Sequence, residues 1–235
     1  MRKRLFGLLL VLVAFTGAAW AEEVTVSDPG SSFDLIYDTD NLGLFGVPTL
    51  LNNTVFFTPT NFFALSEDGV PPAGDGEEIT NSTVTFRLVA KDPSILLQNF
   101  QVQANGDYRL DGAGTAVDVD GQIRLFDPED PFNQFTDQLT TSSDLTINDA
   151  NSHDWEATAA LGISGSNEVV ITLQNILTAS TTELGTSAFI EKKFEGVQIT
   201  VVPIPAAAWL FGSGLLGLGL MRRRRNAASA QPAQT

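Results

Sequence analysis

The chain of 235 residues contains no cysteine and only one histidine. The absence of cysteine excludes disulfide bonds, thiol catalysis and thiolate metal sites. A single histidine cannot form a typical zinc site, because such sites take several histidine or cysteine ligands. His153 also has no accompanying Gly-x-Ser-x-Gly motif, and its neighbours predict a turn before a strand. We therefore do not expect a catalytic histidine.

Other enzyme signatures are scarce as well. No glycine-rich loop precedes a predicted helix, which disfavours phosphate binding. A glycosidase needs two carboxylates at a defined separation. The sequence has 28 acidic residues, so many distant pairs are conceivable and none of them indicates a catalytic site. We expect a protein that is not an enzyme, with a polysaccharide-active hydrolase as a remaining alternative.

Basic residues are rare between the two ends of the chain. Residues 22–200 hold six basic residues and all 28 acidic ones, a formal charge of −22, whereas the whole chain carries −15. Such a domain repels nucleic acid and anionic lipid headgroups. It would attract divalent cations, basic partners or cationic polysaccharide. The alternative is that the acidic surface serves only to keep an exported protein soluble.

The first 21 residues have the three parts of a secretory signal. Residues 2–4 are basic, an apolar run extends from Leu5 to about Phe15, and Ala19 and Ala21 occupy the −3 and −1 positions of a signal-peptidase site. We expect cleavage after Ala21, so that Glu22 becomes the N-terminus. The alternative is an uncleaved membrane anchor.

The other end predicts a membrane-spanning helix of marginal length. Ala206–Met221 is almost wholly apolar or glycine, and at 1.5 Å per residue it spans about 24 Å of a bilayer core about 30 Å thick. A block of four basic residues follows, and it predicts a membrane stop because basic residues favour the cytoplasmic side. The block consists of Arg222, Arg223, Arg224 and Arg225. Residues 226–235 would then be a cytoplasmic tail, and residues 22–200 would lie outside the cytoplasmic membrane.

Three elements occur in order within residues 201–225: Val202-Pro203-Ile204-Pro205, a span rich in glycine and leucine, and Arg222–Arg225. Together they resemble a PEP-CTERM sorting signal in its Val-Pro-x-Pro variant. The resemblance implies processing by an exosortase, a membrane protease of Gram-negative bacteria, after an inner-membrane stage. It also implies a final place at the cell surface or in an extracellular matrix with exopolysaccharide or biofilm. An ordinary C-terminal anchor would give the same topology without processing.

Apolar and polar residues alternate in several segments of residues 22–200, which predicts half-buried strands. The clearest segments are Thr83–Ala90, Asn99–Ala104, Ala116–Phe126, Trp155–Ile163, Glu168–Leu177 and Val197–Val201. Asn105-Gly106 favours a type I′ turn, and so predicts a hairpin between two strands. Gly121 is expected to mark a bulge or bend. The fold class is all-β, an antiparallel β-sandwich with a jelly roll as one topology, plus a helix at each end of the chain.

Two loops and one aromatic-rich segment complete the domain. Gly, Pro and acidic residues predict exposed loops at Glu67–Ile79 and Asp127–Gln134. The aromatic residues are Phe45, Phe56, Phe57, Phe62 and Phe63. We expect them to fill the core rather than form a carbohydrate platform, because phenylalanine lacks the polar edge that tryptophan and tyrosine use at wet sites.

Two groups of carboxylates are candidate calcium ligands. Asp118 and Asp120 lie two residues apart on one strand face, and Asp127, Glu129 and Asp130 lie in a predicted loop. Carboxylate oxygens suit Ca²⁺, although neither group carries a complete calcium-loop motif. A solvated strand face is the alternative for the first group. The acidic sandwich thus gives a second hypothesis, a calcium- or carbohydrate-binding lectin-like module.

Overall fold

A computed structural model describes residues 22–205, except for the side chains of residues 194, 195 and 203–205. Nearly all of this region is strand. It contains two 3-10 helices, η1 (Thr39–Asn41) and η2 (Gly43–Phe45). In residues 22–205 no helix has the length and hydrophobicity that crossing a membrane requires. The predicted all-β class is therefore confirmed for the described part of the chain.

The strands form two antiparallel sheets. The first sheet has the order β1 (Glu23–Ser27), β2 (Phe33–Asp38), β6 (Glu77–Ala90), β12 (Glu168–Thr181), β8 (Thr115–Asp127), β9 (Asp130–Gln138). The second has the order β10 (Thr140–Thr141), β11 (His153–Ser166), β7 (Ile95–Asp111), β13 (Ser187–Pro205), β4 (Thr54–Phe57), β3 (Thr49–Leu51), and β5 (Phe63–Glu67) also pairs with β13.

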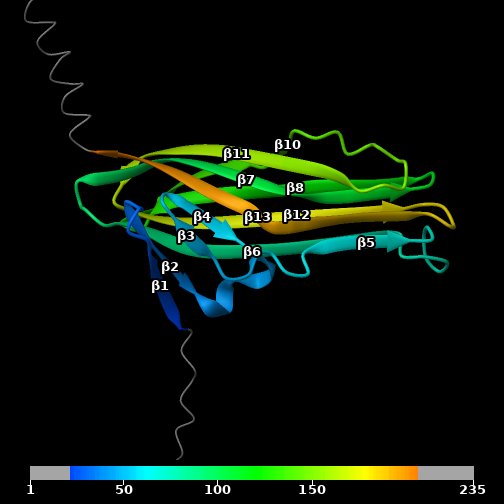
Figure 1. Cartoon of the computed structure of the whole chain (residues 1–235), viewed down its shortest axis with the longest axis horizontal. Helices are drawn as coiled ribbons and strands as arrows, with labels where there is room; N and C mark the ends of the chain where they lie inside the picture. Colours follow the sequence, from blue (N-terminus) through cyan, green and yellow to red (C-terminus); the bar gives the residue numbers. More distant parts are fainter. Residues whose placement is uncertain (1–21, 206–235) are drawn as a thin grey trace, which may run out of the picture.

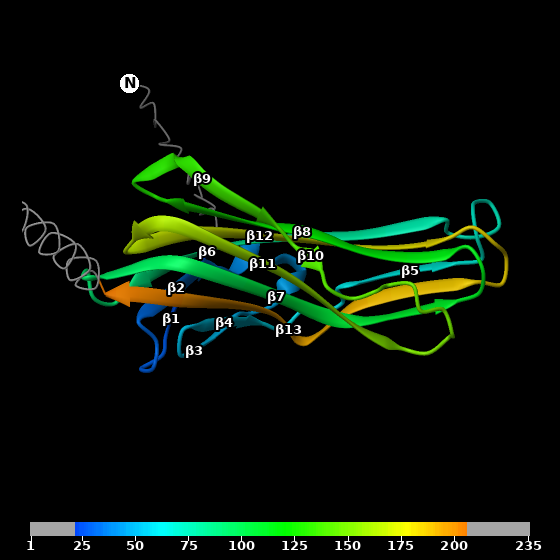
Figure 2. The ribbon, with the colours of Figure 1, turned by 90° about the horizontal axis from the view of Figure 1, so that it is seen from above.

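The sheets pack face to face as an elongated β-sandwich (Figures 1 and 2). One end carries the loops at residues 68–76 and 182–186. The opposite end carries the β8–β9 turn and the end of β13, which is the orange arrow in Figure 2. The described chain therefore leaves the domain at the end that bears the β8–β9 turn.

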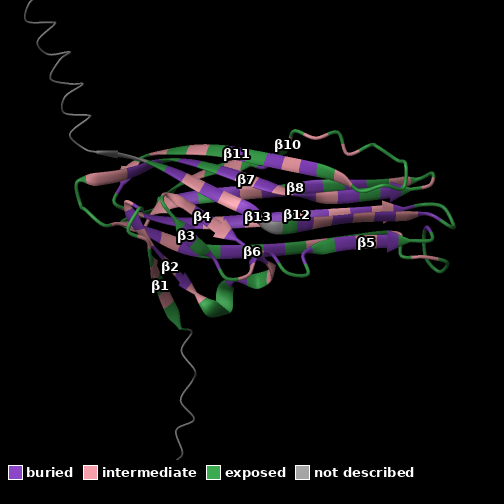
Figure 3. Cartoon of the chain, viewed as in Figure 1, coloured by how far each residue is buried: buried purple, intermediate pink, exposed green. Residues whose placement is uncertain are grey.

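The core lies between the sheets because side chains of a strand alternate between its two faces. Buried and accessible residues alternate along the long strands, as Figure 3 shows. On β6 the inward side chains are Val84, Phe86 and Leu88, and on β7 they include Phe100 and Val102. The predicted alternation is thus confirmed.

The phenylalanine-rich segment contributes mostly to this core. Phe45, Phe57 and Phe62 are buried, and the ring of Phe45 meets those of Phe57 and Phe62 edge-on at 5.6 Å. Such edge-to-face pairs add stability beyond the burial of apolar area. Phe63 is an exception, since it is 42% exposed, and Phe56 is half-buried on the outer face.

The hairpin predicted at Asn105-Gly106 is wrong. Strand β7 runs without interruption from Ile95 to Asp111, and Gly106 pairs with Trp155 on β11 and Lys192 on β13. A Cβ atom at Gly106 would lie 1.8 Å from the backbone oxygen of Glu191 and 2.7 Å from Trp155 Nε1. The glycine therefore allows close packing beneath the tryptophan, and not a turn.

The loop predicted at Asp127–Gln134 is also wrong for most of its length. The chain turns between Asp127 and Asp130, and β9 then pairs with β8 as far as Gln138. β9 lies at an edge of the first sheet, where charged residues and proline are tolerated because one side of the strand has no partner.

The loop predicted after Glu67 is confirmed between β5 and β6. β8 pairs with β12 in continuous register through Gly121, without the expected bulge.

Candidate functional site

The proposed sorting motif lies at the end of β13. Val202 pairs with Asn99, and Pro205 pairs with Ile95, so the backbone of the motif is already extended against β7. Pro203 and Ile204, between them, pair with Leu97 and Leu96 after a register shift of one residue that follows Val202.

The other predicted sorting elements lie outside the described residues. They include the cleavage residues Ala19 and Ala21, the apolar span and the tail 226–235. The four residues of the predicted membrane stop lie there as well, namely Arg222, Arg223, Arg224 and Arg225. The membrane stop and the cleavage site therefore stay predictions from the sequence.

The first group of candidate calcium ligands lies on the outer face of the first sheet. Asp118 and Asp120 are both exposed on β8, where successive outward positions are about 6.8 Å apart. The Oδ1 atom of Asp120 accepts a hydrogen bond from the backbone N–H of Gly121 at 2.6 Å. This geometry matches the solvated strand face that the sequence left as the alternative.

The second group lies in the β8–β9 turn. Asp127 Oδ1 accepts a hydrogen bond from the backbone N–H of Glu129 at 2.8 Å, while Glu129 and Asp130 are exposed. Asp118 and Asp127 are nine residues apart on one strand, so the two groups do not share a site. Within residues 22–205 no group of three His, Cys, Asp or Glu side chains is arranged to hold a metal ion.

His153 is the first residue of β11. Its Nε2 atom lies 2.8 Å from Asp149 Oδ1, and this hydrogen bond holds the pKa of the Asp149 carboxyl down at about 2. The imidazole also packs against the ring of Tyr108, with the ring centroids 5.6 Å apart. These contacts tie the loop before β11 to β7, which is a structural role.

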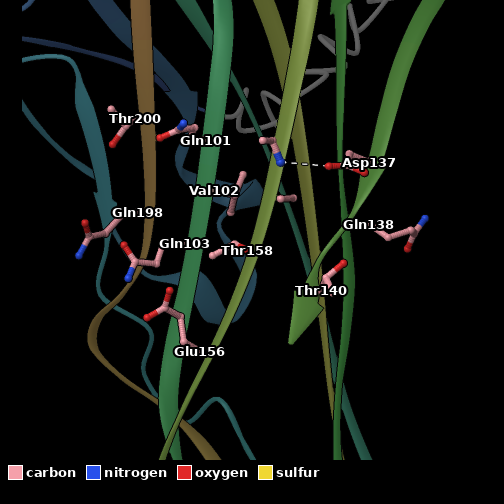
Figure 4. Close-up of a pocket in the computed structure, with 12 residues that line it drawn as sticks. Gln101, Val102, Gln103, Asp137, Gln138, Thr140, Glu156, Thr158, Gln198 and Thr200 are labelled. Carbon is pink, nitrogen blue, oxygen red and sulfur yellow. Dashed lines mark hydrogen bonds between the residues drawn. The ribbon is translucent and has the colours of Figure 1, made fainter. Parts of the chain in front are cut away.

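A groove with a volume of about 440 Å³ crosses the outer face of the second sheet (Figure 4). Its floor comes from β13, β7 and β11, and the side chains that face outward there are Gln198, Thr200, Gln101, Gln103, Thr158 and Glu156. Their neighbours along each strand, such as Val102 and Ile199, point into the core. The period of two in each strand therefore separates a polar floor from an apolar interior.

The strand register aligns the polar side chains of the floor in two rows. Gln198 on β13 pairs with Gln103 on β7, which pairs with Thr158 on β11. Thr200 pairs with Gln101 in the second row. Paired strands lie about 4.8 Å apart, so the rows place neutral hydrogen-bonding groups side by side across the sheet.

One wall of the groove forms where the chain crosses from the first sheet to the second. β9 ends at Gln138, Leu139 is buried, and β10 joins β11 through the pair Thr140–Thr158. Asp137 Oδ2 accepts a hydrogen bond from the backbone N–H of Ala160 at 3.0 Å, the dashed line in Figure 4. This bond uses one oxygen of the carboxylate and fixes the wall against β11.

A second hollow continues beyond Glu156. It has a volume of about 360 Å³, shares Glu156 with the groove and reaches Asp154 and Lys193. Lys193 Nζ contacts Asp107 at 2.7 Å and Asp154 at 2.5 Å, and these two partners raise the pKa of Lys193 to about 12. The charge of Lys193 is therefore compensated by the carboxylates of Asp107 and Asp154.

The sequence did not reveal this groove. The alternation of Phe100 and Val102 with Gln101 and Gln103 was visible, and it predicted a strand with one polar face. The position of Gln198 opposite Gln103 depends on the pairing of strands 95 residues apart. No local pattern carries that information.

Comparison of the chain with protein-family models, with curated proteins and with solved structures finds no match.

Proposed function

We propose that the chain is an exported, non-enzymatic protein of the cell surface or extracellular matrix of a Gram-negative bacterium. Signal peptidase would remove residues 1–21, and an exosortase-like protease would process the C-terminal segment after an inner-membrane stage. The observation that carries the proposal is the joint presence of Ala19-Trp20-Ala21 at one end and of the Val202–Pro205 motif, apolar span and Arg222–Arg225 block at the other.

The charge of the domain supports this destination. Residues 22–200 carry a formal charge of −22, which disfavours nucleic acid and anionic lipid as partners. It suits a protein that stays soluble outside the cell, close to exopolysaccharide or biofilm. The jelly-roll order of the strands and the helices at both ends of the chain stay predictions within this proposal.

Mass spectrometry of the mature protein from the native host tests the processing step. We expect a C-terminus upstream of Arg222 in wild type, and an unprocessed, membrane-bound form when Pro203 and Pro205 are both replaced by alanine. Replacement of Pro128 and Pro131, two prolines in the β8–β9 turn region, is the matched control and leaves processing unchanged. Mature wild-type protein that retains Arg222–Arg225 would refute exosortase sorting.

The second candidate is a calcium- or carbohydrate-binding lectin-like module, and the polar groove on the second sheet favours its carbohydrate form. Its floor presents amide and hydroxyl groups, which match the donors and acceptors of sugar hydroxyls. Calorimetric titration with CaCl₂ separates the two forms. A calcium-dependent module binds Ca²⁺ through Asp118 and Asp120 or through Asp127, Glu129 and Asp130, whereas no heat with Ca²⁺ would reject that form.

A further inference from the structure

The groove on the second sheet holds three glutamine side chains that, within the described residues, do not pair with one another. Gln101 and Gln103 lie on β7 and Gln198 lies on β13. Figure 4 marks one hydrogen bond among the residues drawn, the bond from Ala160 N–H to Asp137. The glutamine amides of the floor thus keep their donors and acceptors available to a ligand.

The outer face of the first sheet provides an internal contrast. There, Gln138 Nε2 donates to Gln122 Oε1 at 3.4 Å, and Gln122 Nε2 donates to Gln174 Oε1 at 3.2 Å. Gln174 Nε2 in turn donates to Asn81 Oδ1 at 3.2 Å. Outward glutamines on paired strands can therefore satisfy each other in this fold, whereas those of the groove floor are left open to a ligand.

Each glutamine amide offers two N–H donors and one carbonyl acceptor, and each threonine hydroxyl offers both roles. A ligand that hydrogen-bonds to both rows at once must carry alternating donors and acceptors, and it must be large enough to contact several neighbouring strands. A polymer of hydroxyl-bearing sugar units has that chemistry. We propose that the groove formed by Gln101, Gln103, Gln198 and Thr200 binds a neutral polysaccharide chain.

The charge of the groove selects a neutral chain rather than an acidic one. Asp137 and Glu156 line the groove, and among the described residues none that lines it is basic. Lys193, in the adjoining hollow, is already paired with Asp107 and Asp154. A polymer that carries carboxylate or phosphate groups would meet carboxylates without a compensating cation, in a domain with a formal charge of −22.

The size of the groove suits a short stretch of such a chain. Its volume of about 440 Å³ lies within the range of roughly 300–1,000 Å³ that is typical of ligand sites. The adjoining hollow at Asp154 and Lys193 extends the surface along β7 and β11. A chain lying across the glutamine rows can therefore continue past Glu156.

The test uses the full chain, purified in a detergent without a sugar headgroup. Calorimetric titration with cellohexaose, laminarihexaose and maltohexaose, and affinity electrophoresis in dextran, measure binding to four neutral glucans. Sodium alginate is the acidic comparison. We expect binding to at least one neutral glucan and at least tenfold weaker binding to alginate.

The double variant Gln103→Ala with Gln198→Ala removes the centre of one row. Loss of two hydrogen bonds worth about 1 kcal/mol each weakens the affinity at least about tenfold. The matched control is Asn81→Ala with Gln174→Ala, which truncates two hydrogen-bonded amide side chains on the outer face of the first sheet, away from the groove lining, and leaves the affinity unchanged. If the double variant unfolds at a lower temperature than wild type, Gln103→Glu replaces it, because this change keeps the side-chain shape while it adds a charge.

Absence of binding to all four glucans would overturn the proposal, as would tighter binding to alginate or an equal loss in the variant and its control. The inference rests on the carbohydrate-binding candidate above, and its failure is distinguishable from failure of the sorting proposal. The groove variants are expected to be exported and processed like wild type, as read by the mass of the mature C-terminus. Glucan binding by the purified chain, together with mature protein from the native host that retains Arg222–Arg225, would reject sorting and leave the groove standing.

Discussion

Replacing Lys192 by methionine is predicted to stabilise the protein. Lys192 lies on β13 with only 6% of its surface exposed, and its Nζ atom has no hydrogen-bond partner within the described part of the chain. The ammonium group lies over the ring of Trp155, 4.8 Å from its centroid, and 5.5 Å from the centroid of Phe62. Burial of this charge lowers the pKa of Lys192 from 10.5 to about 7.

The size of the effect follows from that pKa. One pKa unit corresponds to about 1.4 kcal/mol, so the buried charge costs about 5 kcal/mol below pH 7, where lysine is protonated in both the folded and the unfolded chain. Contact of the cation with the two rings returns about 1–2 kcal/mol. Methionine has an unbranched side chain of similar length without charge. The net gain expected from Lys192→Met is about 3–4 kcal/mol at pH 6.

The gain shrinks as the pH rises. Between pH 7 and 10.5 the unfolded chain binds a proton that folded Lys192 has released, so wild-type stability increases with pH in this window. At pH 9 about 2 kcal/mol of the penalty remains. The wild type therefore approaches the variant in alkaline solution, and the difference between them is largest at or below neutral pH.

Urea unfolding at pH 6 and pH 9, followed by tryptophan fluorescence, measures the difference in unfolding free energy between Lys192→Met and wild type at each pH. Lys193→Met is the matched control, because the neighbouring Lys193 is accessible and pairs with Asp107 and Asp154. Loss of those surface pairs is expected to lower stability slightly. The reasoning is refuted if Lys192→Met fails to stabilise the protein, or if its gain is the same at both pH values.

Three further changes probe the packing and the C-terminal strand. Gly106→Ala is expected to cost about 3 kcal/mol in urea unfolding, since its Cβ would lie 1.8 Å from a backbone oxygen of β13, whereas Gly162→Ala meets its nearest atom at 3.5 Å and should cost far less. Phe45→Ala is expected to lower the unfolding free energy by about 3–5 kcal/mol, because it empties a fully buried ring site; a loss below about 1 kcal/mol would contradict this packing. Cysteines at Gln101 and Thr200, which pair across β7 and β13 just before the sorting motif, are expected to slow C-terminal processing when oxidised and to restore it on reduction, with each single cysteine variant behaving as wild type.

Most of the long strands were predictable from the sequence, because the alternation of apolar and polar residues is a local property. The segment Thr83–Ala90 became part of β6, and Glu168–Leu177 became part of β12. The errors arose where residues with turn or loop preferences are held in strands by partners. Asn105-Gly106 stays extended because Trp155 and β13 pack against it.

For the candidate site, too, residue types were predictable from the sequence, whereas their arrangement in space was not. The carboxylates chosen from the sequence, such as Asp118 and Asp127, were selected by residue type, and the fold places them far apart on β8. In the sequence Gln103 marks only the polar face of a predicted strand, and Gln198 is an ordinary glutamine, so neither residue indicates a binding site. Their significance comes from a register that sets them opposite each other.

By itself the sequence determined the all-β class and the strongly acidic character of residues 22–200, because composition and short-range order carry those properties. The expectation of export rests on the signal-like N-terminus, and the expectation of sorting rests on a resemblance of the C-terminal motifs. Only the tertiary structure decided that Lys192 is buried, that Gly106 lies within a strand and that the glutamines of β7 and β13 share a groove. Each of these depends on contacts between segments distant in the chain. A period of two sets which face a side chain takes, whereas strand pairing sets what it meets there.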